Sequence, residues 1–462
     1  MGLRFGTDGV RGAAAELSDA FVFALGEAAA RTLGSKFYVG RDTRESGPRI
    51  ERALVAGLEK GGAVVTVLGV APTPAVAWLA ARDGVCGAVI SASHNPWFDN
   101  SIKFFGPGGR KLSDEVEAEL ERLLDELLDE PASERVDSES GTRGSAARQN
   151  AEVREDGGER TNVSFDPVAA LEAWTESLLA AVSVSLGGLH VVIDCANGAQ
   201  SAIAAGVISG AGARVDVLHA SPDGRNINDG CGSTHPGDLQ AAVVASGADL
   251  GLAFDGDADR LLAVDEQGAV VDGDHLLALF AADLHARREL RGDLVVVTVM
   301  TNLGFRIAME GLGIEVVETA VGDRYVLEAL ARLGGSLGGE QSGHIVFAEL
   351  ATTGDGLLSG LQLLDLLRRS GRPFSELAAQ SMTQLPQVLR NVAVAQRRSD
   401  IAELLAVQIA EEQLLLGTSG RILLRPSGTE SLIRVMVEAA TEALASEVAG
   451  RLAAAVEEVC SA

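Results

Sequence analysis

Residues Phe37 to Val67 read FYVGRDTRESGPRIERALVAGLEKGGAVVTV and contain the pattern that decides the fold. A short β-rich run leads through a turn into a segment where Ile50, Leu54 and Leu58 recur every four residues. This recurrence predicts a helix with one apolar face, which Gly61-Gly62 ends before a second β-rich run. The segment therefore predicts a βαβ unit whose apolar strands are buried on both faces of a parallel sheet.

The same pattern returns twice further along the chain. The second copy spans 190–217, with a helix expected over 197–212, and the third spans 294–317, with a helix over 302–313. Three copies predict three related α/β domains. The C-terminal segment differs, because strands over 388–394, 421–424 and 432–437 alternate with helices over 400–412 and 441–459. It predicts a small α+β domain with a mostly antiparallel sheet.

The composition sets limits on function. Hydrophobic residues make up 47% of the 462 residues, enough for packed cores, and the net charge of -27 argues against nucleic-acid binding. The N-terminus lacks an apolar signal segment, and no apolar run approaches bilayer length. The four cysteines have no CxxC spacing, so free thiols in a reducing compartment are expected. We expect a soluble cytoplasmic protein that does not bind membranes.

Ser91-Ala92-Ser93-His94-Asn95-Pro96 follows the apolar run 85–90, so it is expected at the end of a strand. Ligand sites of open α/β sheets favour that position. The small neighbours leave the Ser93 hydroxyl accessible, and His94 and Lys103 could manage protons and phosphate charge. An Asn-Pro turn with a capping serine is an equally good interpretation of the local sequence.

Asp255-Gly256-Asp257-Ala258-Asp259-Arg260 places three carboxylates at alternate positions of one loop. Such acids can converge on a hard cation such as Mg²⁺ or Ca²⁺, and without a metal they would repel one another. An EF-hand loop is a rival, but its sixth position needs Gly, not Arg260, and the flanking segments are strand-like. The sequence favours a phosphate-linked Mg²⁺ site over both the EF-hand and a solvated acidic turn.

Three further motifs are weaker. Gly338 to His344 contains Glu340 and Ser342, which could grip sugar hydroxyls or an amine, whereas His344 is as easily packed beneath the loop. Arg425 to Glu430 combines an arginine, hydroxyls and glycine in a plausible phosphate cradle. The glycines around Arg11 permit close backbone approach to a phosphate. The segment 40–47 is interpreted as a helix start with Asp42 or Ser46 available as a cap.

These motifs, in this order, resemble the α-D-phosphohexomutase superfamily over nearly the whole chain. The resemblance implies four domains around a central cleft and one Mg²⁺ ion per subunit. It implies that Ser93 carries a phosphoryl group, whose oxygen joins Asp255, Asp257 and Asp259 as metal ligands. Arg11, His94 and Lys103 then line the phosphoserine pocket, and Arg260 resembles the superfamily's active-site arginine. The resemblance places the sugar on Glu340, Ser342 and His344 and the non-reacting phosphate on Arg425, Ser427, Gly428, Thr429 and Arg434.

The expected domains are 1–130 with the phosphoserine loop, 164–265 with the metal loop, 266–375 with the sugar loop and 376–462 with the phosphate loop; 131–163 is expected to be a polar linker. Gln341 and the segments 321–326 and 434–438 favour the amino-sugar branch over the phosphomannomutase/phosphoglucomutase branch. Two departures from the superfamily's usual pattern are Ala258, where Gly is commoner, and Ser431, where Pro is usual.

The reaction expected from this resemblance isomerises a phosphosugar through a 1,6-bisphosphate intermediate in a monomer or homodimer. A phosphomannomutase or phosphoglucomutase on the same scaffold is the nearest alternative. A serine-nucleophile, metal-dependent phosphatase and a non-catalytic sugar-phosphate-binding relic are alternatives from other classes.

Overall fold

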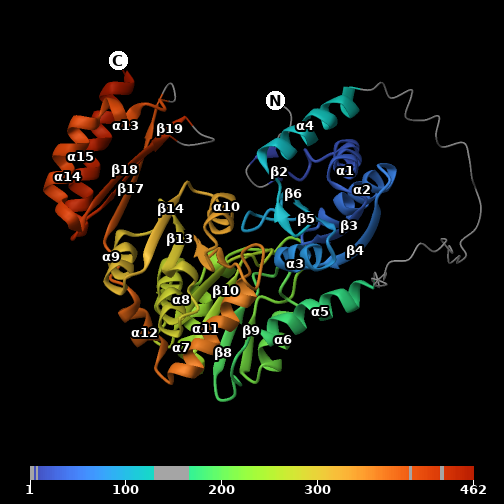
Figure 1. Ribbon diagram of the computed structural model, residues 1–462, viewed down its shortest axis with the longest axis horizontal. Coiled ribbons are helices and arrows are strands. Elements are labelled where there is room, and N and C mark those ends of the chain that lie inside the picture. The colour runs from blue at the N-terminus through green and yellow to red at the C-terminus, as the bar shows by residue number, and fades with distance from the viewer. Residues whose placement is uncertain (1–4, 7–8, 130–165, 395–397, 427–430, 462) are drawn as a thin grey trace, which may run out of the picture. The chain divides into compact units, whose positions relative to one another are not determined.

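The computed structural model describes residues 5–6, 9–129, 166–394, 398–426 and 431–461 (Figure 1). The chain divides into two compact units. One contains Met1–Leu261 and Glu349–Asp365, and the other contains Leu262–Ala348 and Leu366–Ala462. The expected linker 131–163 lies outside the described residues. Within the described ranges, no helix has the length and apolar character needed to cross a bilayer.

The N-terminal sheet of the first unit has the strand order β1-β2-β6-β5-β3-β4, and β7 pairs with β6. β3 runs parallel to β4 and β5, whereas β6 is antiparallel to β2 and β5. Its strands are β1 (Phe5–Gly6), β2 (Gly9–Ala13), β3 (Lys36–Arg41), β4 (Val64–Val70), β5 (Cys86–Ile90), β6 (Asp99–Gly106) and β7 (Arg110–Lys111).

Alternate residues of β3 pack into two hydrophobic cores, one on each face of the sheet. Phe37 and Val39 pack on one face with α1 (Asp19–Leu33), α2 (Gly47–Lys60) and α4 (Asp114–Asp129). Tyr38 packs on the other face with α3 (Thr73–Asp83). The predicted helix stripe of Ile50, Leu54 and Leu58 is fully buried, which confirms the four-residue periodicity as the signal for this βαβ unit.

The second set of strands in this unit is parallel, with β8 (His190–Asp194) between β9 (Arg214–Leu218) and β10 (Leu250–Phe254). The expected helix over 197–212 is shorter, because α6 covers only Ala204–Gly210. Ala196 and Asn197 have positive φ angles of 52° and 48°, which a helix does not allow, so the chain enters α6 through a turn. The other helices are α5 (Pro167–Ala180), α7 (Gly237–Ser246) and the part of α11 (Gly356–Ser370) up to Asp365.

The second unit contains a sheet of order β14-β13-β15-β16, in which only β16 is antiparallel to its neighbour. A short hairpin of β11 (Leu261–Asp265) and β12 (Val270–Val271) precedes it. The strands are β13 (Leu294–Thr298), β14 (Glu315–Thr319), β15 (Leu337–Gly339) and β16 (Ile345–Phe347), and the helices are α8 (Gly273–Arg287), α9 (Leu303–Leu312), α10 (Asp323–Leu333) and α12 (Phe374–Ser381).

The C-terminal part of the second unit has the antiparallel sheet β17-β19-β18, with helices packed on one face (Figure 1). The helix expected over 400–412 is interrupted at Leu405, whose φ and ψ of −100° and 14° separate two helices. The elements are β17 (Gln387–Ala393), α13 (Ile401–Leu404), α14 (Ala406–Leu416), β18 (Arg421–Pro426), β19 (Leu432–Glu438) and α15 (Glu442–Ser461). The predicted α/β fold class with a distinct α+β C-terminal part is confirmed.

Candidate active site

Ser93 and the three acids lie together in the first unit, although they are more than 160 positions apart. Ser93 follows β5, and Asp255, Asp257 and Asp259 follow β10. Because both segments leave the ends of buried strands, each is held at the edge of its sheet. The Ser93 hydroxyl donates a hydrogen bond to Asp255 Oδ2 at 2.5 Å, and the Ser93 side chain is almost completely buried.

The Ser93 backbone is held in an uncommon conformation. Its φ is 52°, a left-handed value that costs about 1–2 kcal/mol for a residue with a side chain. A Cβ on Gly256 would lie 2.6 Å from the Ser93 carbonyl oxygen, so only glycine lets the two loops approach this closely. Backbone strain kept by tight packing is a feature of functional sites.

The carboxylates of Asp255, Asp257 and Asp259 form a buried cluster. One oxygen from each lies within 4.8 Å of the others, and together they could hold a metal ion. Burial, followed by the charges of Asp259 and Asp257, raises the pKa of Asp255 well above its usual value. Three hard oxygen donors that destabilise one another without a cation are a donor set suited to Mg²⁺. The residues present therefore fit the metal that the sequence predicts.

Lys103 contacts two acids of this cluster. Its ammonium is 3.1 Å from Asp257 Oδ2 and 3.7 Å from Asp259 Oδ2, and the side chain is buried. Thr73, at the start of α3, also donates to Asp257 Oδ2 at 2.7 Å. Both contacts are to the same oxygen of Asp257, Oδ2, and the Lys103 ammonium partly offsets the charge of this carboxylate.

His94 lies beside the same serine, and the charges of Arg11 and Arg260 act on His94. His94 Nδ1 lies 3.3 Å from Ser93 Oγ. Burial, then the positive charges of Arg260 and Arg11, lower the pKa of His94 to about 4. His94 is therefore neutral near pH 7. Arg260 follows the acidic loop, and its backbone N–H donates to Asp255 Oδ1 at 3.2 Å. The structure thus places His94, Lys103 and Arg260 beside Ser93 and the acids, and Arg11 close enough for its charge to act on His94.

The sequence did not indicate the residues whose hydrogen bonds support the Ser93 backbone. Asp42, expected as a helix cap, is fully buried and forms an ion pair with Arg44. It also accepts a hydrogen bond from Ser91 Oγ at 2.6 Å, and Ser91 Oγ accepts from the Ser93 N–H at 3.0 Å. Ser46, the other expected cap, makes no capping bond. The only sequence signal was an acid and an arginine two positions apart directly after a buried strand.

A second support comes from the loop before Cys231. Asn228 donates to the backbone oxygens of Ser93 at 2.9 Å and Asn95 at 3.1 Å, and Arg44 donates to the same two oxygens. A hollow of about 490 Å³ opens beside His94, lined also by Trp97, Asn228, Asp229 and His235 among others. Asn228, Asp229 and His235 lie far from Ser93 in sequence, so no local pattern indicated them.

The predicted sugar loop lies in the second unit between β15 and β16. Glu340 is half-buried and accepts from the Gly322 N–H at 3.1 Å, whereas Ser342 is exposed. His344 is buried, with Nε2 3.3 Å from Asp323 Oδ2, which agrees with the interpretation that it packs beneath the loop. Gln341 Nε2 lies 3.4 Å from Asp272 Oδ2.

The predicted phosphate loop is described only in part. Ser427, Gly428 and Thr429 lie outside the described residues. Arg425 on β18 and Arg434 on β19 are directly opposite one another across the antiparallel pair. Burial, followed by the charge of Arg434, lowers the pKa of Arg425. Like charges placed opposite one another destabilise a sheet. A bound anion would therefore stabilise this pair by reducing the repulsion between the two arginines.

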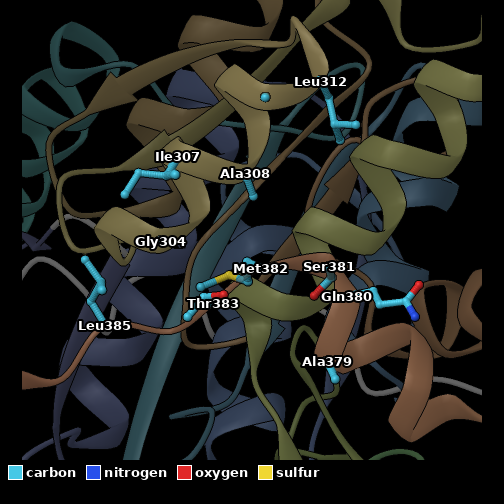
Figure 2. A pocket seen from close by; sticks show the side chains of 11 residues that line it. Gly304, Ile307, Ala308, Leu312, Ala379, Gln380, Ser381, Met382, Thr383 and Leu385 are labelled. Atoms are coloured by element: carbon cyan, nitrogen blue, oxygen red, sulfur yellow. The ribbon is translucent and has the colours of Figure 1, made fainter. Parts of the chain in front are cut away.

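An apolar hollow of the second unit is not a chemical site. It has a volume of about 420 Å³ and lies between α9 and the segment around α12 (Figure 2). Ile307 and Leu312 line one side, and Met382 and Leu385 line the other. Its lining contains no titratable side chain, so it offers no group for acid–base or metal chemistry.

Four family models match the chain in series. They describe the α/β/α domains I, II and III and the C-terminal domain of phosphoglucomutase/phosphomannomutase, at residues 2–130, 172–268, 272–385 and 389–455. The chain belongs to the phosphoglucomutase/phosphomannomutase family.

Among the relatives, the phosphoglucosamine mutase of Pelotomaculum thermopropionicum is 48% identical over 99% of this chain and 100% of that protein. The phosphoglucosamine mutase of Frankia alni is 50% identical over 98% of this chain and 97% of that protein. A phosphoglucomutase/phosphomannomutase family protein from Burkholderia thailandensis has a TM-score of 0.73 at 23% identity, covering 98% and 97% of the two chains. The N-acetylphosphoglucosamine mutase of Aspergillus fumigatus, solved with GlcNAc-6P and magnesium, has a TM-score of 0.69 at 22% identity, covering 100% and 96%.

Proposed function

We propose that the chain is a phosphoglucosamine mutase, an isomerase that interconverts glucosamine 6-phosphate and glucosamine 1-phosphate. The phosphoglucosamine mutases at 48–50% identity over nearly the whole chain support this substrate. The structural observation that carries the proposal is the 2.5 Å hydrogen bond between Ser93 and Asp255, which joins the serine to the acidic cluster. A phosphoryl carrier and a metal site must share this position for the reaction to occur.

Ser93 acts as the carrier of the phosphoryl group. Its phosphorylated form donates the group to the free O1 or O6 of the sugar phosphate and yields glucosamine 1,6-bisphosphate. The bisphosphate reorients within the site, and its other phosphoryl group is then transferred back to Ser93. Because nucleophile and acceptor are both held in place, catalysis depends on positioning and on electrostatic stabilisation.

Asp255, Asp257 and Asp259 would hold one Mg²⁺ ion together with an oxygen of the Ser93 phosphate. When bound, the ion would supply positive charge that stabilises the phosphoryl group during its transfer. Lys103 and Arg260 add fixed positive charge from the protein beside the same carboxylates. Neutral His94, 3.3 Å from Ser93 Oγ, can accept a proton from a hydroxyl as transfer begins. Arg11 contributes a further positive charge to phosphate binding.

The second unit supplies the groups that recognise substrate. We assign the sugar to Glu340 and Ser342, with buried His344 holding the loop from beneath. We assign the non-reacting phosphate to Arg425 and Arg434, together with Ser427, Gly428 and Thr429. The position of Arg425 opposite Arg434 on neighbouring strands supports this assignment, since a phosphate can accept hydrogen bonds from two guanidinium groups.

A side-by-side assay tests the proposed substrate. The purified enzyme, activated with a hexose 1,6-bisphosphate, is given the 6-phosphates of glucosamine, glucose and mannose, with intact-mass analysis of Ser93 phosphorylation. We expect the highest kcat/KM for glucosamine 6-phosphate. Preferred turnover of mannose or glucose phosphate would assign the enzyme to the sister branch. Release of inorganic phosphate without isomer formation would indicate a phosphatase, and an unphosphorylated, inactive protein would indicate a binding relic.

The enzyme is proposed to work in the cytoplasm as a monomer or homodimer. All four cysteines are free thiols, and three of them are buried. Such thiols are typical of a reducing compartment.

A further inference from the structure

Three side chains of different chemistry meet in the first unit outside the proposed active site. One donor atom each from Asp194, His219 and Cys231 lies within 4.8 Å of the other two. Asp194 ends β8, His219 follows β9, and Cys231 precedes a short 3₁₀ helix at Gly232–Thr234. None of the three has a role in the proposed mutase reaction.

The three donors are buried to different depths. Asp194 and Cys231 are completely buried, whereas about a quarter of the His219 side chain is exposed, at 26%. His219 Nδ1 lies 3.0 Å from Asp194 Oδ2. The ligands of a tetrahedral zinc ion lie about 3.3–3.8 Å apart, given metal–ligand bonds of about 2.0–2.3 Å. The cluster is therefore close to the size that zinc needs, with one open side at His219.

The surroundings also match a metal centre. The second ring nitrogen of His219, Nε2, lies 3.2 Å from Asp238 Oδ2. A histidine that binds metal through one nitrogen commonly donates through the other to a carboxylate, which fixes its orientation. The two oxygens of Asp194 accept hydrogen bonds from the Ala196 and Gly232 N–H groups, each at 2.9 Å. These bonds hold the Asp194 carboxylate in one orientation.

We propose that Asp194, His219 and Cys231 bind a zinc ion, with solvent as the fourth ligand and Asp238 supporting His219. A thiolate and an imidazole select zinc over the magnesium that suits the oxygen-only cluster of Asp255. Binding replaces the thiol proton of Cys231 and the Nδ1 proton of His219, which leave to solvent.

The ion would brace the loops that hold the active site. The loop after Asp194 contacts the acidic loop, because the Ala199 N–H donates to the Gly256 oxygen at 2.8 Å. The loop before Cys231 contacts the serine loop through the bond from Asn228 to the Ser93 oxygen at 2.9 Å. One ion joining both loops therefore supports Ser93 and its acids without touching substrate.

Cobalt uptake by the full-length protein tests the proposal. The protein is stripped of metal, saturated with Mg²⁺ to fill the acidic cluster, and titrated with Co²⁺. Only a cobalt–thiolate bond gives the charge-transfer absorption, and the acidic cluster contains no sulfur. We expect the band to saturate at a single ion per chain and to disappear when Zn²⁺ is added.

Three variants make the result specific. Cys231→Ser should abolish the band, and the matched control Cys195→Ser, at a buried cysteine outside the cluster, should keep it. His219→Asn should weaken cobalt binding about tenfold or more. Asn tolerates the His219 φ of 46°, so His219→Asn should keep the backbone conformation. It therefore tests the site independently if Cys231→Ser fails to fold. The absence of a band in the wild type, or its persistence in Cys231→Ser, would overturn the proposal.

Discussion

Both units contain like charges held close together, but the two clusters differ in sign and in setting. In the first unit, Asp255, Asp257 and Asp259 are buried on loops. In the second, Arg425 and Arg434 face each other on neighbouring strands and are partly exposed. Burial makes charge repulsion costlier, and solvent screens it. The acidic cluster therefore depends more strongly on its counter-ion than the arginine pair depends on phosphate.

Among the changes considered, loss of Ser93 beside the acids should lower the mutase rate the most. Ser93→Ala removes the phosphoryl carrier and should lower mutase turnover about 10⁴-fold or more, while leaving the fold intact. Isomer formation followed by chromatography measures the rate, and circular dichroism checks the fold. Turnover at the wild-type rate would remove Ser93 from the mechanism.

Asp257→Asn tests how far the acidic cluster depends on a cation. We expect turnover to fall by at least about 100-fold, together with a weaker Mg²⁺ requirement, because one of three metal ligands becomes neutral. Chelation should lower the melting temperature of the wild type and lower that of the variant less. Glu59→Gln is the matched control, because it also removes one carboxylate charge but lies at the exposed end of α2. Its turnover and its response to chelator should equal those of the wild type. Equal responses of the two variants to chelator would contradict a metal at Asp257.

Arg425→Ala makes the corresponding test on the positive cluster. Removal of a charged hydrogen-bond donor to phosphate should raise KM for the sugar phosphate about 10–100-fold. Inorganic phosphate should also stabilise the variant less than the wild type in thermal unfolding. Arg451→Ala is the control, because Arg451 pairs with Glu412 and Glu447 on the helical face. An unchanged KM in Arg425→Ala would exclude Arg425 from phosphate binding.

The smallest effect is expected at Ala258, between two of the acids. Its φ is 63°, so the methyl group is strained where the superfamily more often has glycine. Ala258→Gly should raise the free energy of unfolding by about 0.5–1 kcal/mol, the reverse of the usual cost of glycine. Ala454→Gly, at an exposed position of α15, should lower it by about 1 kcal/mol. Urea unfolding of both variants gives the comparison, and a loss of stability in Ala258→Gly would show that burial of the methyl outweighs its strain.

Local periodicity was sufficient for most secondary structure. Ile50, Leu54 and Leu58 recur at helical spacing and are all fully buried. The failures came where loop geometry overrides periodicity, as at Asn197, whose positive φ shortens the expected helix. Leu405 is another case, since its backbone angles divide a segment that is helical in pattern.

The sequence by itself determined which residue types carry the chemistry, because a serine after a strand and three alternating acids are recognisable in a short window. Only the tertiary structure decided that Asp42, Arg44 and Asn228 hold Ser93, and that Asp194, His219 and Cys231 meet. These residues come from separate loops, and no periodicity relates their spacing. Their proximity follows from the order of strands in each sheet and from the close approach at Gly256, which are properties of packing and not of any local pattern.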